Sequence, residues 1–403
     1  MKKIFLTALL LHLFALGMLA QNRTITFEET RVWKEIVEKA KKENKLIFVD
    51  CYTDWCGPCK LLVTNTFTKD HVADFFNENF VNAHFEMEKD IDGIANKDNW
   101  AVGAYPTLLF FDPFTEKVVH RLVGAGQPDW LVEGGKTAMD PTKNLNSLME
   151  RYNGGERSPE FITSYLKALG SGLMRNEQNK VAVDYLKDMS LDQLATGENW
   201  EVIRTNITDP FADVIRIVAA NMERFSSIEG VRRGSVDMHL RGLLMDVAQS
   251  FTSAKVPFDE TRYDEVLAYC KSLNIPAADP ALFYLGTAGK AHNGDWSGVL
   301  ADVLKVAENN EIMDRFALYH ENAFIPMLGK SRDEAIVGKV IELLDTRIES
   351  PESSVYTKPR FLNMKRDLYR AIGNDVAADE AMAQAEQLNK QIQDEIDKRN
   401  NTM

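Results

Sequence analysis

Two cysteines stand close together in the stretch DWCGPCK, residues 54–60, with Gly57 and Pro58 between them. A helix places positions i and i+3 on one face, so Cys56 and Cys59 can close a small disulfide if a helix begins at the first of them. Pro58 favours that start, because a proline in the first turn loses no helical hydrogen bond. The unpaired N–H groups at the helix start favour a thiolate at Cys56. The spacing predicts a redox pair in which Cys56 attacks and Cys59 resolves the mixed disulfide.

Half of a metal site and an inactive scaffold are the alternatives for this motif. A structural zinc needs two further ligands, usually a second Cys pair or a close His pair. The chain has four cysteines, and His71 and His84 are isolated. We predict that Cys51 and Cys270 are buried core thiols. The sequence therefore predicts neither a metal nor another cofactor.

The first 22 residues, MKKIFLTALLLHLFALGMLAQN, have the layout of a secretory signal. Two lysines precede an apolar core, and small residues follow at Gly17 and Ala20. We predict cleavage near Ala20 and a periplasmic or secreted protein. The alternative is an uncleaved membrane anchor, since the apolar stretch of about 17 residues is at the lower limit for a bilayer span.

The charge of the chain excludes one class of partner. The sequence has 47 basic and 60 acidic residues, and residues 1–20 contain two of the lysines and no acidic residue. The mature charge is therefore 45 minus 60, or −15. We expect no nucleic-acid partner, because the phosphate backbone would repel this chain. Four cysteines are also too few for a small scaffold held together by disulfides.

The hydrophobic pattern predicts an α/β unit over residues 21–141. Almost wholly apolar stretches indicate buried strands, and apolar residues three and four apart indicate helices. Strands are expected at 46–52, 80–88, 104–112 and 117–124, and helices at 27–44, 59–67, 69–80, 90–101 and 128–139. The order, a crossover followed by a hairpin, predicts a mixed sheet with helices on both faces.

Residues 142–403 contain no convincing strand and are predicted to form an all-α helical array. Ser158 and Pro159 are a typical helix start. Residues 284–308 and 368–388 each show a helix, a turn with glycine and an alanine-rich second helix. They resemble tetratricopeptide-like hairpins, although the spacing is irregular.

The motifs VDCYTDWCGPCK (49–60) and AYPT (104–107) resemble the thioredoxin family over residues 27–140. The chain is most similar to the branch that includes the periplasmic C-terminal domain of DsbD-type electron conductors. The resemblance implies a thioredoxin fold, with Cys56 as nucleophile and Cys59 as resolving cysteine. It also implies that Asp50 is a buried acid that takes the proton from the second thiol. The alternative for Asp50 is an ordinary polar residue at a strand end.

The resemblance also assigns residues that face the substrate. Pro106 matches the family's cis-proline and Tyr105 precedes it, so an extended substrate is expected to pair there as an added strand. Trp55 matches the tryptophan that shields the site, and Gly57-Pro58 is the dipeptide of reducing thioredoxins. The sequence departs from the family at His84, where many thioredoxins have a lysine near the buried acid.

These residues predict an exported thiol–disulfide oxidoreductase that reduces protein disulfides. A reductant outside the cytoplasm needs an electron donor, for which a membrane thiol conductor is expected. A disulfide isomerase or a haem-maturation reductant would use the same site. The alternative from another class is a binding protein, in which the helical array recognises an unknown partner and the α/β unit is accessory.

Overall fold

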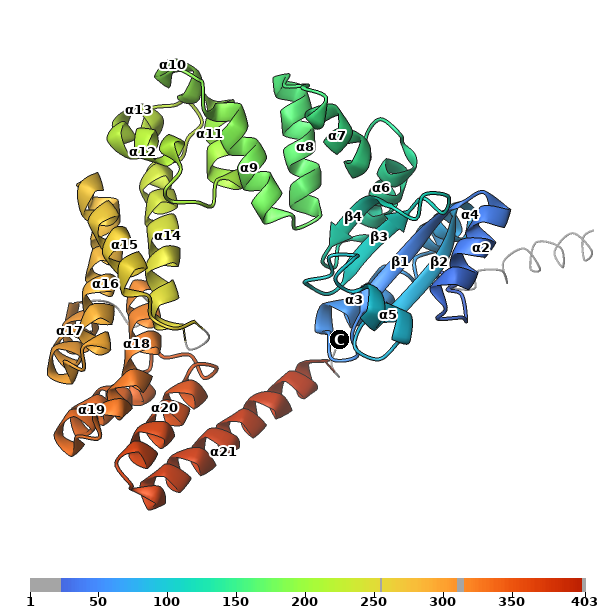
Figure 1. Cartoon of the computed structure of the whole chain (residues 1–403). Coiled ribbons are helices and arrows are strands. Elements are labelled where there is room, and N and C mark those ends of the chain that lie inside the picture. Colours follow the sequence, from blue (N-terminus) through green and yellow to red (C-terminus); the bar gives the residue numbers. More distant parts are fainter. Residues whose placement is uncertain (1–22, 254–255, 310–314, 401–403) are drawn as a thin grey trace, which may run out of the picture. The chain divides into compact units, whose positions relative to one another are not determined.

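A computed structural model gives the structure of the chain and describes residues 23–253, 256–309 and 315–400 (Figure 1). The N-terminal part is α/β and the rest is helical, which confirms the predicted fold class. The predicted signal over residues 1–20 lies outside the described residues, so export stays a prediction. Within the described ranges, no helix is both long enough and apolar enough to cross a membrane.

The described strands form one mixed sheet in the order β2-β1-β3-β4. Their bounds are β1 (Leu46–Tyr52), β2 (Phe80–Glu86), β3 (Thr107–Phe111) and β4 (Val118–Val123). β1 and β2 are parallel, whereas β1 with β3 and β3 with β4 are antiparallel. The end of β1 therefore lies beside the start of β3, where Cys51 pairs with Thr107. This places the two motifs, after β1 and before β3, at the same end of the sheet.

Helices cover both faces of the sheet (Figure 1). Their bounds are α2 (Trp33–Glu43), α3 (Gly57–Asn65), α4 (Asp70–Asn79), α5 (Ile91–Asn96) and α6 (Pro128–Met139). Successive residues of a strand point to opposite faces, so β1 contributes to two cores. Val49 packs with Ile36 of α2 in one core, and Phe48 packs with Phe76 of α4 in the other. By the same alternation, the side chains of Asp50 and Cys51 point to opposite faces of the sheet.

Several elements are shorter than predicted: the helix expected at 90–101 covers only Ile91–Asn96, and the strand expected at 80–88 ends at Glu86. Two further differences have a clear physical reason. The first helix begins at Trp33 instead of residue 27, because the preceding segment is extended and the N–H of Glu28 donates to the carbonyl of Asn82. The third strand begins at Thr107, after Pro106, which has no N–H to donate to the sheet. The strand at 46–52 and the helix at 128–139 have the predicted bounds.

The remaining described elements are helices. In chain order they are α7 (Leu145–Asn153), α8 (Pro159–Ser171), α9 (Arg175–Leu186), α10 (Leu191–Leu194), α11 (Gly197–Asn206), α12 (Asp213–Ala220), α13 (Met222–Ser226), α14 (Ser235–Gln249), α15 (Glu260–Leu273), α16 (Asp279–His292), α17 (Trp296–Asn309), α18 (Arg315–Leu328), α19 (Glu334–Glu349), α20 (Lys358–Ala371) and α21 (Asp375–Asn400). Short 3-10 helices lie at η2 (Ser250–Thr252), η3 (Pro276–Ala278) and η4 (Gly329–Ser331).

The two segments that look alike in sequence both form helical hairpins. α16 and α17 contact each other, as do α20 and α21. The turns contain Gly294 and Gly373, at φ of +73° and +78°. A residue with a side chain is strained at such angles, so glycine is suited to both turns. A repeat architecture beyond these hairpins remains a prediction.

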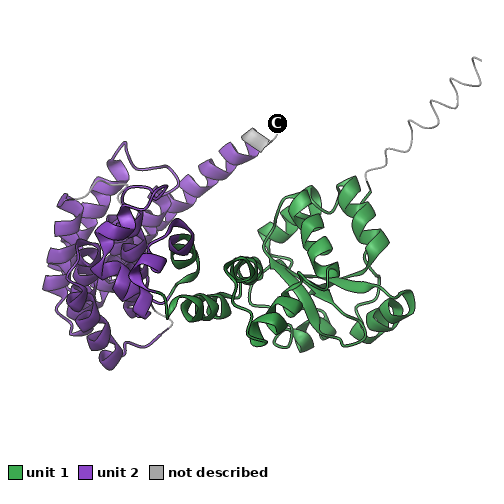
Figure 2. Cartoon of the chain, turned by 90° about the horizontal axis from the view of Figure 1, so that it is seen from above, with its two compact units in different colours: residues 1–189, 201–208 green, residues 190–200, 209–403 purple. Residues whose placement is uncertain are grey.

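The described residues form two compact units (Figure 2). One comprises the residues up to Met189 together with Glu201–Thr208, and the other comprises Ser190–Trp200 and the residues from Asp209 onward. The first unit includes the sheet and also α7, α8 and α9. The predicted boundary near residue 141 lies between α6 and α7. The division into domains at 21–141 and 142–403 stays a prediction.

Candidate active site

The two cysteines of the motif are joined at the start of α3. Cys56 is the N-cap residue, with extended backbone angles, and Pro58 stands in the first turn. Cys56 and Cys59 form a disulfide, with their Cα atoms 5.3 Å apart. The sulfur of Cys56 accepts a hydrogen bond from the N–H of Cys59 at 3.1 Å. The helix start therefore supplies a donor that would stabilise negative charge on Cys56 in the reduced form.

Both cysteines are almost covered, and Trp55 lies exposed beside them. Cys56 is 3% exposed and Cys59 is 4% exposed, whereas Trp55 is 66% exposed. The indole N–H of Trp55 donates to the carboxylate of Glu88 at 2.9 Å. Its ring also meets the edge of Tyr105, with ring centroids 5.8 Å apart. A partner sulfur therefore has to approach the disulfide along a restricted path next to these two aromatic rings.

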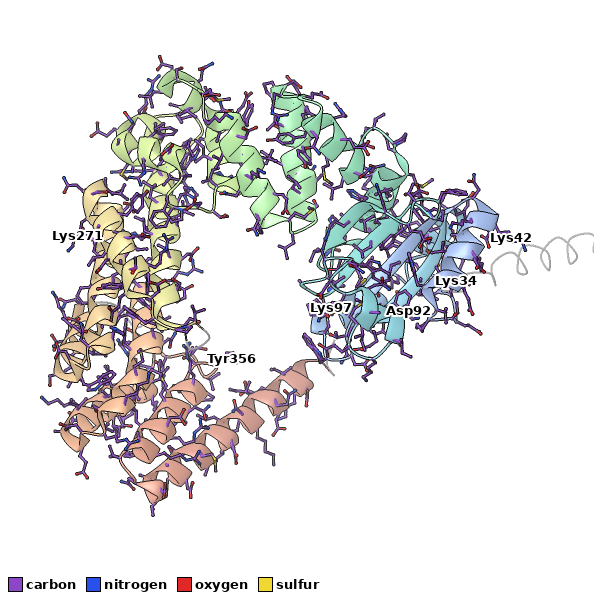
Figure 3. All side chains as sticks on the ribbon, viewed as in Figure 1. Lys34, Lys42, Asp92, Lys97, Lys271 and Tyr356 are labelled. Carbon is purple, nitrogen blue, oxygen red and sulfur yellow. A yellow bond between two sulfur atoms is a disulfide. The ribbon has the colours of Figure 1, made fainter. Side chains whose placement is uncertain are left out.

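The backbone before β3 lies at the same end of the sheet as the cysteines. The peptide bond between Tyr105 and Pro106 is cis. The carbonyl of Pro106 accepts from Gly124 N–H at 2.9 Å, and the hydroxyl of Thr107 donates to the carbonyl of Ala104 at 2.8 Å. These bonds hold the segment that was predicted to pair with an extended substrate. Lys97, labelled in Figure 3, adds a positive charge, since its ammonium lies 5.7 Å from the centroid of the Tyr105 ring.

Asp50 is a buried carboxyl group without a full set of partners. It lies near the end of β1, is 3% exposed, and its Oδ1 has no hydrogen-bond partner among the described residues. Burial raises the pKa of Asp50 to about 7. A carboxyl group with that pKa can release and accept a proton near neutral pH.

His84 lies opposite Asp50 in the pairing of β1 with β2, at the position where the sequence departs from the family. Its ring stacks on Phe27 at 4.5 Å, and its Nε2 contacts the guanidinium of Arg31. Burial, together with the charge of Arg31, lowers the pKa of His84 to about 4. His84 is therefore neutral at pH 7 and supplies no cation that would stabilise the ionised form of Asp50.

Sequence reasoning missed Glu86, which organises the loop beside the cysteines. Glu86 is 4% exposed, and its carboxylate accepts from the N–H of Asp54 at 3.2 Å and from the N–H of Glu88 at 2.8 Å. It thereby links the residue before Trp55 to the residue that binds the Trp55 indole. The only signal in the sequence is the acidic run that ends the second strand, which by itself indicates no partner.

The two cysteines outside the motif, Cys51 and Cys270, are buried, and the structure also bears on the metal alternative. Cys51 and Cys270 are free thiols and are fully buried. Burial raises the pKa of both thiols, which disfavours their reactive thiolate forms. In the ranges that the structure describes, no cluster of three His, Cys, Asp or Glu side chains could hold a metal ion.

Comparisons with known proteins match the α/β part of the chain. A family model described as thioredoxin-like matches residues 30–113. Thioredoxin H4 of Arabidopsis thaliana is 31% identical over 113 residues, which cover 27% of this chain and 85% of that protein. Thioredoxin-1 of Saccharomyces cerevisiae is 35% identical over 91 residues, which cover 22% of this chain and 77% of that protein. A candidate disulphide-isomerase from Bacteroides thetaiotaomicron, solved in solution, is 43% identical with a TM-score of 0.28, covering 30% of this chain and 98% of its own.

Proposed function

Because the chain belongs to the thioredoxin family, we propose that it catalyses thiol–disulfide exchange on protein disulfides through Cys56 and Cys59. One observation carries the proposal: the Cys56 sulfur caps α3 and accepts the N–H of Cys59, to which it is also bonded. A sulfur so placed is stabilised as a thiolate and is therefore a good nucleophile once the pair is reduced.

We propose the following reaction, in which the role of Asp50 is supported by its burial and by its pKa of about 7. The thiolate of reduced Cys56 attacks one sulfur of the substrate disulfide, and the other substrate sulfur leaves as a thiolate that takes up a proton. Cys59 then loses its proton to the ionised carboxylate of Asp50 and attacks the Cys56 sulfur in the mixed disulfide. The Cys56–Cys59 disulfide forms and the second substrate sulfur is released. Two electrons have passed from the protein to its substrate.

The direction of exchange is proposed from the dipeptide Gly57-Pro58. This is the dipeptide of thioredoxins with reduction potentials near about −270 mV, far below about −120 mV for a strong oxidant. We therefore propose a reductant and keep isomerisation and haem maturation as other uses of the same pair. The substrate is proposed to lie against Trp55, Tyr105 and Pro106.

The cellular setting is part of the proposal. We propose export through residues 1–20 and reduction by a membrane thiol conductor, in keeping with the resemblance to DsbD-type proteins. The all-α region is proposed to bind a partner, since arrays of helical hairpins present extended surfaces. The alternative is a binding protein, in which the all-α region carries the function and the α/β unit is accessory.

The proposal is tested by insulin reduction and by the reduction potential of the pair. Cys56→Ser should abolish insulin reduction, and Cys59→Ser should accumulate a mixed disulfide because the resolving thiol is missing. Cys270→Ser is the control, since it removes a buried free thiol and leaves the pair intact. Undiminished activity in Cys56→Ser would refute the mechanism. A potential near that of a strong oxidant would refute the reducing direction.

A further inference from the structure

A pocket lies away from the cysteines, in the unit that contains the sheet. It has a volume of about 560 Å³ and is lined by residues of β4, α6, α7 and α8 and of the loops that connect these helices. α7 and α8 both contact β4, so these helices of the all-α region close the pocket against the edge strand. No residue of the redox motif lines it. Pockets of this size typically hold small molecules or single side chains.

The imidazole of His120 lies in the lining of this pocket. His120 is 3% exposed, and its Nδ1 has no hydrogen-bond partner among the described residues. Burial lowers the pKa of His120 to about 4, so the ring is neutral at pH 7. A neutral imidazole has one donor and one acceptor nitrogen. Nδ1 is itself closed to solvent, so a ligand in the pocket would meet the other ring nitrogen, Nε2. Since no protein partner at Nδ1 fixes the tautomer, Nε2 can donate or accept, and a hydroxyl group can do both.

Buried His320, in the other unit, shows a different arrangement. Its Nε2 lies 3.1 Å from the hydroxyl of Thr287, which also donates to the carboxylate of Asp302 at 3.0 Å. His320 is thus held in a network of protein groups and lines none of the described pockets. The Nδ1 of His320 also has no partner among the described residues, so the two histidines differ in the bonded Nε2 of His320 and in the pocket that His120 lines. That pocket is what makes His120 available to a ligand.

Charge does not select the ligand. Most charged residues of the rim are paired: Arg151 with Glu156, Lys143 with Asp140, and Glu133 with Lys136. The two that remain, Glu160 and Lys167, have opposite signs. The rim therefore has no net charge, which favours a neutral ligand over an anion or a cation.

The walls favour a flat ring. Leu122 and Trp130 line the pocket from the side of the sheet and α6, and Leu148 and Phe161 line it from α7 and α8. The guanidinium of Arg151 lies over the Phe161 ring, 4.7 Å from its centroid, so a planar group would meet Trp130 together with the part of Phe161 that Arg151 leaves uncovered. We propose that this pocket binds a neutral phenolic group, whose ring packs against Trp130 and Phe161 and whose hydroxyl bonds to the imidazole of His120. The site is separate from the redox function.

The first experiment compares two probes on the full chain. 4-Methylphenol and toluene differ only by the hydroxyl group, so their affinities measured by NMR titration isolate the bond to His120. We expect one saturable site for 4-methylphenol, about tenfold weaker binding of toluene, and a shift of the His120 ring nitrogen resonances with the phenol only. Equal affinity for the two probes, or no saturable binding of 4-methylphenol, would overturn the proposal.

Variants separate the pocket from the rest of the surface. Ser164 is exposed and lines the pocket, and its neighbour Thr163 is exposed but does not. Ser164→Trp should fill the pocket and weaken 4-methylphenol at least about tenfold, while the matched Thr163→Trp should not. His120→Phe should make the two probes bind alike. Binding that survives Ser164→Trp would place the phenol elsewhere and refute the site.

A second pair of probes identifies the source of the phenol. N-acetyl-tyrosinamide carries the same ring as 4-methylphenol on a peptide backbone, and N-acetyl-phenylalaninamide lacks its hydroxyl. Binding of the tyrosine probe, with discrimination against phenylalanine, supports a tyrosine side chain of a partner as the occupant. Binding of 4-methylphenol alone supports a free phenol.

Discussion

The α/β part and the helical part of this chain treat their buried charges in opposite ways. In the α/β part, Asp50 is 3% exposed and one of its oxygens has no partner among the described residues. In the helical part, Glu321 is 1% exposed and forms an ion pair with buried Arg347. An unpaired buried charge costs stability, whereas a paired one is partly compensated. The difference indicates that the first group is suited to proton exchange and the second holds two helices together.

The same contrast appears at two helix starts. α3 begins with the sulfur of Cys56 as its cap, and α19 begins with the carboxylate of Asp333, which accepts from the N–H groups of Ala335 and Ile336. Both caps satisfy backbone donors that would otherwise have no helical partner. One cap can also react, because its atom is part of a redox pair. The same position at a helix start is therefore purely structural when the cap is Asp333, and available for thiol chemistry when the cap is Cys56.

Removing one member of the buried ion pair should have the largest effect. Glu321→Ala leaves Arg347 buried without its partner, so we expect α18 and α19 to lose about 3–5 kcal/mol of local stability. Amide hydrogen exchange of these helices measures this, and insulin reduction should be unchanged. The double variant Glu321→Met with Arg347→Met removes both charges and should recover most of the loss. Unchanged exchange in Glu321→Ala would show that the pair is not structural.

A smaller effect is expected at Asp50, and it depends on pH. Because burial raises the pKa of Asp50 from 3.8 to about 7, the folded chain holds a proton that the unfolded chain has already released. The contribution of Asp50 to the free energy of unfolding therefore falls as pH rises from about 4 to about 7, and it stays low above pH 7. Relative to Asp50→Asn, the disulfide form of the wild type should lose about 3 kcal/mol between pH 5 and pH 8.

Amide exchange of β1 at the two pH values measures this difference. The variant should also reduce insulin more slowly and lose the inflection near pH 7 in its rate profile. Identical pH dependence of β1 stability in the wild type and in Asp50→Asn would contradict the raised pKa.

The smallest effect is expected at the caps. Asp333→Ala should cost α19 about 1 kcal/mol, because two N–H groups lose their acceptor, and Asp333→Asn should cost less since it keeps one. Cys56→Ser keeps an acceptor at the start of α3, so its local exchange should resemble that of the reduced wild type although activity is lost. A large loss of α3 structure in Cys56→Ser would mean that the sulfur is needed for folding as well as for chemistry.

Much of the α/β part could be predicted because its signals are local. The apolar stretch LIFVDCY predicts β1, and the Pro58 position predicts that a helix starts at the cysteines, which the structure bears out. The start of α2 was predicted too early because the pairing of Glu28 with Asn82 joins residues more than fifty positions apart. The helices after residue 141 were recognised as helices, but their pairing was predicted only for two hairpins with short turns.

Local spacing was enough to predict the pairing of Cys56 with Cys59, because residues three apart at a helix start are neighbours whatever the rest of the chain does. The surroundings of that pair come from contacts between distant parts of the chain, such as the contact of His84 with Arg31 and the bonds of Glu86 to the loop beside Trp55. The packing of α7 and α8 on β4, which closes a pocket over His120, is also a contact of this kind. Such contacts depend on which distant side chains fill the space around a residue, and no local spacing encodes that.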